Sequence, residues 1–248
     1  MKRNIVENIA VIIPSYKEEK NIFTLIDAIS EAVPDSKIIV VDDSPKEYIG
    51  KIKFLLKKKK NIEIIFRYKK LGRGSAVLHG FNEAFKDKRI KYFFEIDSDL
   101  AHNPNEISRF IDKMEKGRHD VVIGSRYVKG GKTINIVLYR VILSRMINLF
   151  LRFWLNIKIN DFTGGFRMYN GKSIEFLCKS KIKSKGFITL SETLYLLHRK
   201  GFKIAEAPIT VSMKKKGKSN VNARELFRSL FFILSMRIDS FLNNLSLR

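Results

Sequence analysis

The first half of the chain alternates short apolar runs with amphipathic stretches, and this alternation restricts the folds open to it. Runs rich in β-branched and aromatic residues are predicted strands at positions 10–13, 37–41, 62–66, 92–96 and 121–123. Helical spacing occurs between them at 20–32, 49–60, 75–85 and 104–116. Repeated β-α units of this kind build a mostly parallel sheet flanked by helices, so the sequence predicts an α/β fold.

Size and charge limit the class of protein further. The 248 residues are 45% hydrophobic and can bury one sizeable core, so we expect a domain over 1–222 and an amphipathic helical extension over 223–248. The 48 Lys and Arg against 25 Asp and Glu leave a net charge of +23, which indicates an anionic partner such as nucleic acid, acidic lipid or a phosphorylated substrate. The single Cys178 excludes an intramolecular disulfide and favours a reducing, cytosolic environment.

Two carboxylates one residue apart follow the predicted strand 92–96, in the sequence Asp97-Ser98-Asp99. They would emerge at the carboxyl end of the strand, where open α/β sheets bind ligands and where a divalent cation can gather oxygen ligands. An ordinary strand-end turn is the alternative, because so short a motif also occurs by chance.

Polar turns also follow the first two predicted strands. A tyrosine face at Tyr16 can pack on a nucleobase, and Glu18 or Asp43 can accept hydrogen bonds from base or ribose. Ordinary turn and helix-cap chemistry is the alternative for each turn alone. The loop around Gly72 and Arg73 opens a predicted helix, where backbone N–H groups and the arginine can meet phosphate. It lacks the Gly-Lys-Ser/Thr of a P-loop.

Ordered motifs over residues 9–220 resemble those of the inverting family-2 glycosyltransferases and, within them, the dolichol-phosphate mannose synthases. The matching stretches are 11–18, 40–45, 72–80, 97–99, 123–131 and 161–167. Gly-Ser-Arg-Tyr at 124–127, followed by Lys-Gly-Gly at 129–131, is especially characteristic. The resemblance implies a GT-A fold.

The resemblance also implies roles for individual residues. Those assigned to the nucleotide sugar are Pro14, Tyr16, Glu18, Val41, Asp43, Asp97, Ser98 and Lys214. Asp97 and Asp99 are assigned to the metal, with Asp99 as the direct ligand. Arg126 and Arg140 match positions that clamp the phosphate of a polyprenyl phosphate acceptor, a role that the planar guanidinium suits.

The implied reaction moves mannose from GDP-mannose to dolichyl or another polyprenyl phosphate. An acceptor phosphate is already anionic near neutral pH, so its attack on the anomeric carbon needs no general base. Mg²⁺ or Mn²⁺ would stabilise the departing nucleoside diphosphate, and Arg126 and Arg140 would align the nucleophile for inversion. Asp99, Arg126 and Arg140 are therefore the expected catalytic residues, and Glu192 is expected to be structural or orienting.

Membrane contact is expected at residues 134–157, where an apolar stretch is punctuated by Arg140, Arg145 and Arg152. This pattern suits a helix lying in a membrane interface, with core packing as the alternative. The segment 225–247 offers a second such helix, which could instead form a dimer contact or pack back on the domain. No stretch is long enough without charges to span a bilayer, so we expect peripheral association with the cytoplasmic face.

Departures from the family pattern keep other functions open. Ala101 stands where many relatives have Gln or Ser, the element at 214–220 has Lys for Arg and Asn for the final Lys, and the turn holding Asp43 is a residue shorter than usual. The alternatives are transfer of glucose or another hexose from a UDP-sugar to undecaprenyl phosphate, an inactive lipid-binding relative and a basic nucleic-acid-binding protein. The last leaves the acidic turns unexplained, so we expect no specific nucleic-acid partner.

Overall fold

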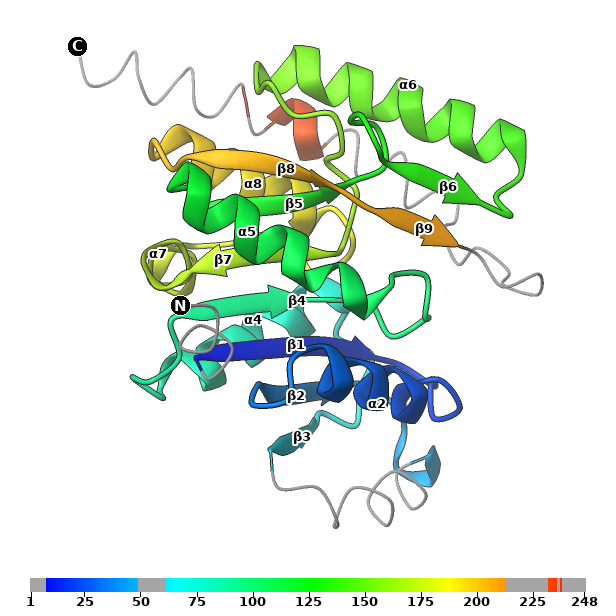
Figure 1. Cartoon of the computed structure of the whole chain (residues 1–248), viewed down its shortest axis with the longest axis vertical. Coiled ribbons are helices and arrows are strands. Elements are labelled where there is room, and N and C mark those ends of the chain that lie inside the picture. The colour runs from blue at the N-terminus through cyan, green and yellow to red at the C-terminus, as the bar shows by residue number, and fades with distance from the viewer. Residues whose placement is uncertain (1–7, 49–60, 213–231, 236, 238–248) are drawn as a thin grey trace.

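A seven-stranded sheet forms the centre of the computed structural model, which describes residues 8–48, 61–212, 232–235 and 237 (Figure 1). The strands lie in the order β3-β2-β1-β4-β7-β5-β8. Their bounds are β1 Ile9–Ser15, β2 Lys37–Asp42, β3 Ile62–Phe66, β4 Tyr92–Glu95, β5 Val121–Ser125, β7 Arg167–Asn170 and β8 Ile204–Pro208. Within this sheet β7 runs antiparallel to both β4 and β5, whereas the other neighbours are parallel. The carboxyl ends of β1, β2, β4 and β5 therefore meet at one edge.

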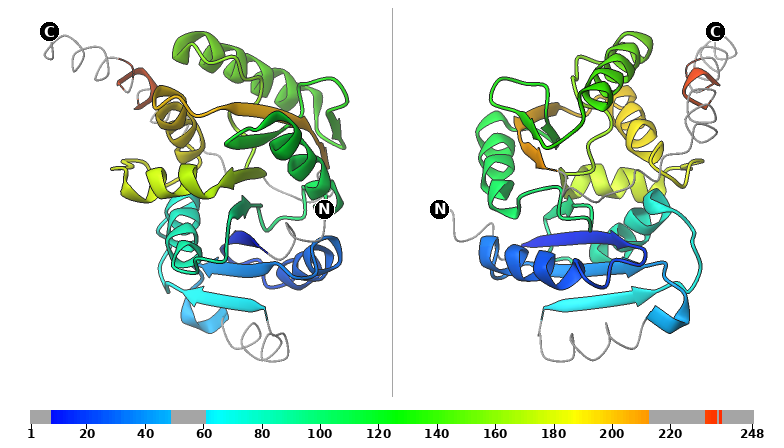
Figure 2. Two further views of the ribbon diagram at one scale, coloured as in Figure 1. Left: turned by 60° about the vertical axis from the view of Figure 1, so that its left-hand side comes forward. Right: turned by 90° about the vertical axis from the view of Figure 1, so that its right-hand side faces the viewer.

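Helices cover both faces of the sheet (Figure 2). On one face lie α2 Ile22–Ala32 and α5 Ile107–Gly117, and on the other lie α4 Arg73–Phe85, α7 Gly171–Lys179 and α8 Thr189–Arg199. Every residue of β1 is buried, because alternate side chains enter one of two apolar clusters, with Val11 facing α2 and Ile12 facing α4. This double burial explains the continuous apolar run at the start of the chain.

A second, two-stranded parallel sheet pairs β6 Lys132–Ile134 with β9 Thr210–Ser212. The long helix α6 Leu138–Leu155 follows β6 and lies at the end of the molecule farthest from β3 (Figures 1 and 2). Short 3-10 turns, η1 Lys46–Tyr48 and η2 Pro104–Glu106, complete the connections. Within the described ranges, no helix combines the length and apolar character needed to cross a bilayer.

The predicted elements of the first half are confirmed as strands β1 to β5 and helices α2, α4 and α5, with ends shifted by a few residues. The predicted helix at 49–60 lies outside the described residues, as does most of the extension 223–248. The described residues 232–235 are helical and pack back on α6, since Trp154 Nε1 donates to the carbonyl oxygen of Ile233 at 3.2 Å and Ile233 is buried. The boundary at residue 222 stays a prediction.

Candidate active site

The Asp-x-Asp turn follows β4, at the edge where the strand ends meet. Arg73, in the first turn of α4, lies against it: Nε donates to Asp97 Oδ1 at 2.7 Å, Nη1 to Glu95 Oε2 at 2.8 Å and Nη2 to the carbonyl of Gly165 at 3.1 Å. The other oxygen of Glu95 accepts from the Tyr169 hydroxyl at 2.6 Å. Arg73, expected from the sequence as a possible phosphate contact, is instead 9% exposed and paired with two carboxylates. It orients Asp97.

Asp99 is more open than Asp97. Its Oδ1 accepts from the N–H of Ala101 at 3.0 Å, across a turn in which Leu100 adopts a left-handed φ of 62°. The Asp99 side chain reaches the surface, but the surrounding protein partly desolvates it, and this raises the pKa of Asp99. The charge of Asp97 is the second cause of the raised pKa. A divalent cation at this turn would relieve the repulsion between the two carboxylates.

The donor set of this turn fits Mg²⁺ or Mn²⁺ bound through few protein ligands. In the part of the chain that the structure describes, no three His, Cys, Asp or Glu side chains converge on one point. A cation held by Asp97 and Asp99 would complete its shell with phosphate oxygens and water, which is the usual way Mg²⁺ binds beside a nucleotide. Ala101 adds no side-chain ligand.

Backbone contacts anchor the Asp-x-Asp turn to β9. His102 forms a backbone bridge with Val211, and the N–H of Ser212 donates to the carbonyl of Ala101 at 3.0 Å. The imidazole packs on the ring of Phe166, with centroids 5.2 Å apart, and burial lowers its pKa. His102 therefore supports the turn as a neutral, packed side chain.

Asp43 holds the glycine loop at the start of α4. It is 3% exposed, and its oxygens accept from Arg67 Nε at 2.5 Å and Nη2 at 2.8 Å and from the N–H groups of Leu71 at 2.8 Å and Gly72 at 3.1 Å. Four donors use the ordinary acceptor capacity of a carboxylate. A hydrogen bond from base or ribose to Asp43 would compete with these four, so its assignment to the nucleotide stays a prediction.

Tyrosine rings and lysine ammonium groups gather beside this loop. The pairs are Lys17 with Tyr48 at 4.9 Å from nitrogen to ring centroid, Lys70 with Tyr16 at 4.8 Å and Lys46 with Tyr68 at 5.6 Å. Rings flanked by cations suit a flat, anionic ligand such as a nucleotide. Of these rings, only Tyr16 could be predicted from the sequence, because nothing in the local pattern places Tyr48 and Tyr68 nearby.

The other predicted nucleotide residues differ in what they can offer. Pro14 and Val41 are buried within β1 and β2, so a ligand would meet their backbone atoms, and Ser98 is only 7% exposed. Glu18 is half-buried; its Oε2 accepts from Asn21 Nδ2 at 2.6 Å and its carbonyl caps the start of α2. Glu18 therefore takes part in the hydrogen bonds at the start of α2, which were the alternative to a contact with the nucleotide. Lys214 lies outside the described residues.

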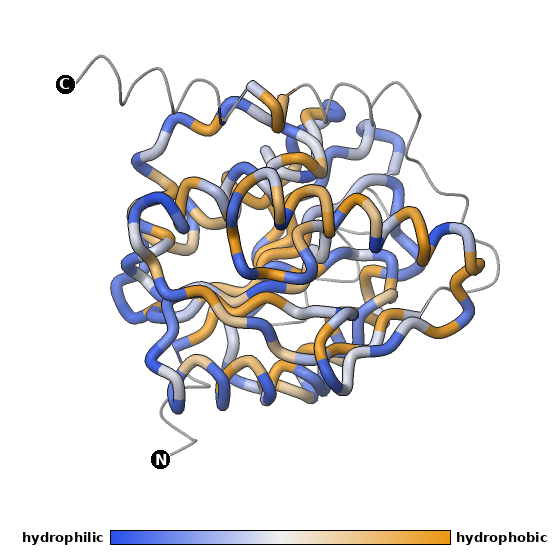
Figure 3. The backbone as a smooth tube through the Cα atoms, turned by 90° about the horizontal axis from the view of Figure 1, so that it is seen from above, coloured by the Kyte–Doolittle hydropathy of each residue, from blue (hydrophilic) through white to orange (hydrophobic). Residues whose placement is uncertain are grey.

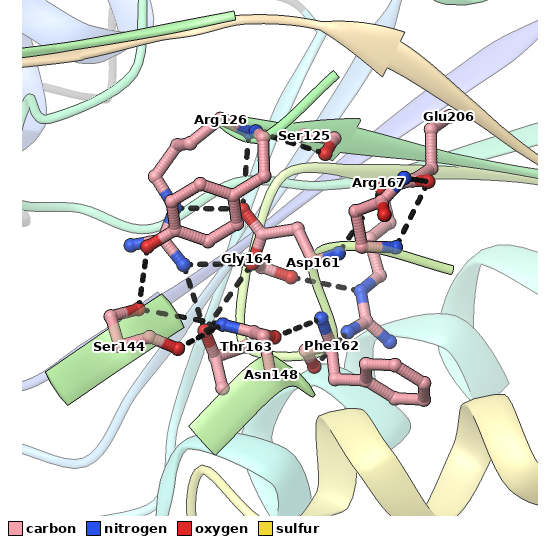
Figure 4. Close-up of polar contacts among 12 residues, drawn as sticks. Ser125, Arg126, Ser144, Asn148, Asp161, Phe162, Thr163, Gly164, Arg167 and Glu206 are labelled. Atoms are coloured by element: carbon pink, nitrogen blue, oxygen red, sulfur yellow. Dashed lines mark hydrogen bonds and ion pairs between the residues drawn. The ribbon is translucent and has the colours of Figure 1, made fainter. Parts of the chain in front are cut away.

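Arg126 follows β5 and is locked to a buried carboxylate (Figure 4). Its Nε donates to Asp161 Oδ2 and its Nη2 to Asp161 Oδ1, both at 2.7 Å, and Nη2 also donates to Thr163 Oγ1 at 2.8 Å. Asp161 is fully buried, whereas 16% of the Arg126 side chain is exposed. Of the five guanidinium N–H groups, the two on Nη1 remain for an outside ligand. Arg126 can therefore offer a phosphate one nitrogen, not the whole fork.

Helix α6 is tied to this pair through two polar side chains on its inner face (Figure 4). Asn148, 2% exposed, accepts from the N–H of Phe162 at 2.6 Å and donates to Thr163 Oγ1 at 3.4 Å. Ser144 Oγ accepts from the Tyr127 hydroxyl at 2.7 Å. The loop that orients Arg126 is thus bonded directly to α6, a connection that no sequence motif signalled.

Arg140 lies near the start of α6, beside Tyr139. Its guanidinium lies over the ring of Tyr139, 5.9 Å from the centroid, and Nε donates to the Tyr139 hydroxyl at 3.2 Å. Its assignment to the acceptor phosphate stays a prediction.

Glu192 is a buried acceptor within the fold. It accepts from the N–H groups of Lys183 at 2.8 Å and Ser184 at 2.9 Å, and from the Ser184 hydroxyl. The carbonyl of Lys185 in the same loop accepts from the N–H of Ser75 at 3.1 Å. Glu192 therefore shapes a loop beside α4, as a structural residue does.

Asn148→Leu tests the bond between α6 and the Arg126 loop. Leucine has a similar size but leaves the buried N–H of Phe162 without an acceptor, so we expect the free energy of unfolding to fall by about 1–3 kcal/mol. Urea denaturation measures this. Asn82→Leu, at an exposed position on α4, is the control and should change stability by less than about 0.5 kcal/mol. Equal effects at both positions would contradict the assignment.

A mostly parallel sheet with an Asp-x-Asp turn at its ligand-binding edge defines the class of this molecule: a glycosyltransferase of the GT-A fold. The chain belongs to Glycosyl transferase family 2, whose sequence profile matches residues 10–177. The expected family, fold and enzyme class are thereby confirmed.

Similar proteins include named transferases. The chain is 32% identical over 223 residues to the polyprenol monophosphomannose synthase of Mycolicibacterium smegmatis, covering 89% of this chain and 83% of that protein. It is 33% identical over 226 residues to the dolichol-phosphate mannosyltransferase of Pyrococcus furiosus, covering 90% of this chain but 61% of that protein. Among solved structures, glucosyl-3-phosphoglycerate synthase from Mycobacterium tuberculosis with Mn²⁺, UDP-glucose and phosphoglyceric acid has a TM-score of 0.65 at 18% identity, covering 95% of this chain and 82% of that chain. This last likeness supports the fold alone.

Proposed function

We propose that this protein transfers mannose from GDP-mannose to dolichyl or another polyprenyl phosphate, with inversion and with a divalent cation, at the cytoplasmic face of a membrane. One observation carries the proposal: the polar site around Arg126 is bonded directly to a helix whose outer face is apolar and exposed. An acceptor with a phosphate head and a hydrocarbon tail matches that combination.

Hydrophobic residues recur along α6 (Figure 3), and many of them are exposed, where a surface helix is normally polar. Leu138 is 71% exposed, Leu149 68% and Phe153 84%. The other exposed apolar residues of this helix are Tyr139, Ile142, Leu143, Met146 and Phe150. Its buried residues are Asn148, Leu151 and Leu155. An apolar outer face flanked by arginines suits a helix lying in a membrane interface.

The reaction needs positioning and charge neutralisation more than proton transfer. An oxygen of the acceptor phosphate forms the new bond to the anomeric carbon, while the bond from that carbon to the nucleoside diphosphate breaks and the electron pair leaves with the diphosphate. Asp97 and Asp99 would hold Mg²⁺ or Mn²⁺, which when bound would neutralise the leaving diphosphate. Arg126 Nη1 would hold the nucleophile, and Arg73 would keep Asp97 oriented.

The choice of donor rests on similarity. The relatives from M. smegmatis and P. furiosus are named for mannose, as is the undecaprenyl-phosphate mannosyltransferase of Micrococcus luteus, which is 28% identical over 86% of this chain and 87% of that protein. Glucose from UDP-glucose is the second candidate, because the same edge of the sheet would accept either nucleotide.

Radiolabelled sugar transfer tests the proposal. The chain is incubated with polyprenyl phosphate in detergent and with labelled GDP-mannose or UDP-glucose, with Mg²⁺, with Mn²⁺ or with a chelator, and the lipid is extracted. Mannolipid formed only with a cation supports the proposal. Label from UDP-glucose alone would change the donor, and no labelled lipid from either donor would overturn the function.

Leu149→Glu or Phe153→Glu should weaken binding to vesicles of phosphatidylcholine and phosphatidylglycerol by about tenfold or more, because burying such a side chain contributes roughly 1.5–3 kcal/mol. Vesicle sedimentation measures the change. Asn82→Glu on α4 alters the net charge equally and should leave binding unchanged. Vesicle binding that survives both α6 substitutions would contradict the assignment of this face.

A probe at position 149 gives the same test a local readout. Burial raises the pKa of the single native thiol, Cys178, to about 11, so it is almost wholly protonated and poorly reactive at neutral pH. A fluorophore attached to Leu149→Cys would then report α6 alone, and its emission should shift to shorter wavelength with vesicles. The same probe at Lys113→Cys on α5 should not shift.

A further inference from the structure

We infer that Arg145 is a second cation of the acceptor phosphate site, sharing the ring of Tyr127 with Arg126. The inference rests on the proposed function and specifies how its phosphate site balances charge.

Two guanidinium groups lie on the same tyrosine. The guanidinium carbon of Arg126 is 5.0 Å from the centroid of the Tyr127 ring, and that of Arg145 is 5.6 Å from it. The two groups therefore lie around one ring, and because Arg145 is exposed its side chain can turn toward a phosphate held by Arg126. The Tyr127 hydroxyl donates to Ser144 Oγ at 2.7 Å, which fixes the ring to the residue next to Arg145.

Charge balance shows why Arg126 is not enough by itself. Its positive charge is matched by the fully buried carboxylate of Asp161, so the pair is neutral overall. A phosphate monoester has a charge of about −1.5 to −2 near neutral pH. Arg126 Nη1 can donate hydrogen bonds to that phosphate, but the pair adds little net positive charge. A dianion at this point needs another cation.

Two buried arginines near the Asp-x-Asp turn are already paired with carboxylates. Arg67 is paired with Asp43, and Arg73 with Glu95 and Asp97. Arg145 differs from them: it is exposed, and no carboxylate within the described ranges forms an ion pair with it. It is the arginine on α6 that also shares an aromatic ring with Arg126.

Among the described residues, neither neighbouring arginine of α6 lies on the Tyr127 ring. Arg152 donates from Nη1 to Asn160 Oδ1 at 2.5 Å, and Arg140 lies over Tyr139. General attraction to lipid headgroups is the competing role for Arg145, since an exposed arginine beside an apolar face meets membrane phosphate in any case. A water-soluble acceptor separates the two roles, because no membrane is present.

The test uses geranyl phosphate, whose short chain keeps it in solution, and measures its affinity by calorimetry and its KM in transfer. Arg145→Gln should raise the dissociation constant and the KM of geranyl phosphate by about tenfold to 100-fold, the usual loss of a charge-assisted hydrogen bond, and should leave the KM of the nucleotide sugar unchanged. Arg145→Lys should recover most of the affinity. Lys158→Gln removes an equal charge at an exposed position just beyond α6 and should have no effect.

A second ligand separates charge balance from support of the Tyr127 ring. Geranyl methyl phosphate has one negative charge, so Arg145→Gln should weaken the binding of this ligand less than the binding of geranyl phosphate. Equal losses for the two ligands would show a structural role and overturn the inference.

Two further outcomes distinguish failure of the inference from failure of the function. Unchanged affinity in Arg145→Gln, with sugar transfer intact, would overturn the inference alone. Absence of both binding and transfer in the unaltered protein would overturn the inference and the proposed function together.

Discussion

Asp99→Asn is expected to lower cation-dependent sugar transfer by at least about 100-fold to 1,000-fold while leaving the fold intact. The substitution keeps the side-chain shape and an oxygen that can accept from the N–H of Ala101, the bond seen at 3.0 Å. It removes the charge that a cation would meet. Radiolabelled transfer measures the loss, and thermal unfolding checks the fold.

The control for this prediction is Asp35→Asn, which removes the same charge at an exposed position before β2 and should leave transfer unchanged. Adding Mn²⁺ or Mg²⁺ well above the concentration needed by the unaltered protein should not restore Asp99→Asn fully. Normal transfer by Asp99→Asn at ordinary cation concentration would remove Asp99 from the metal site.

Arg126→Lys is expected to raise the KM of the polyprenyl phosphate by about tenfold to 100-fold without changing nucleotide affinity. A lysine ammonium can still pair with Asp161, so the buried carboxylate keeps a cation, but lysine has no counterpart of Nη1, the nitrogen left for an outside ligand. Arg126→Ala is a poorer test, because leaving a fully buried carboxylate unpaired costs about 3–5 kcal/mol of stability.

Kinetics at varied lipid and varied nucleotide sugar separate the two affinities for Arg126→Lys. Arg118→Lys, at an exposed position after α5, is the matched control and should behave like the unaltered protein. A comparable loss of nucleotide affinity in Arg126→Lys would place Arg126 at the donor rather than at the acceptor.

The sequence predicted the first half of the fold well because each element there has its own local pattern. The double burial of β1 appears as an uninterrupted apolar run, and α5 as regularly spaced apolar residues. The second half is different. Strand β7 has four residues and begins with Arg167, which is 1% exposed and donates to the carbonyls of Phe162, Gly164 and Leu190. No periodic pattern marks a strand built around a buried arginine.

The same distinction between local and long-range features applies to the site residues. The Asp97–Asp99 turn could be placed from the sequence because it directly follows a strand. The neutralisation of Arg126 could not, since Asp161 lies 35 positions further along the chain. The same holds for Asp43, whose partner Arg67 is 24 positions away.

The order of strands and helices in the first half could be predicted from the sequence, and with it the edge of the sheet where the acidic turn lies, because those features depend on neighbouring residues. The apolar and basic character of α6 could be predicted in the same way. Which face of α6 is buried and which arginines are neutralised by carboxylates could be seen only in the folded molecule, because both depend on contacts between distant segments. Those contacts leave the outer face of α6 exposed and Arg145 without a carboxylate partner among the described residues.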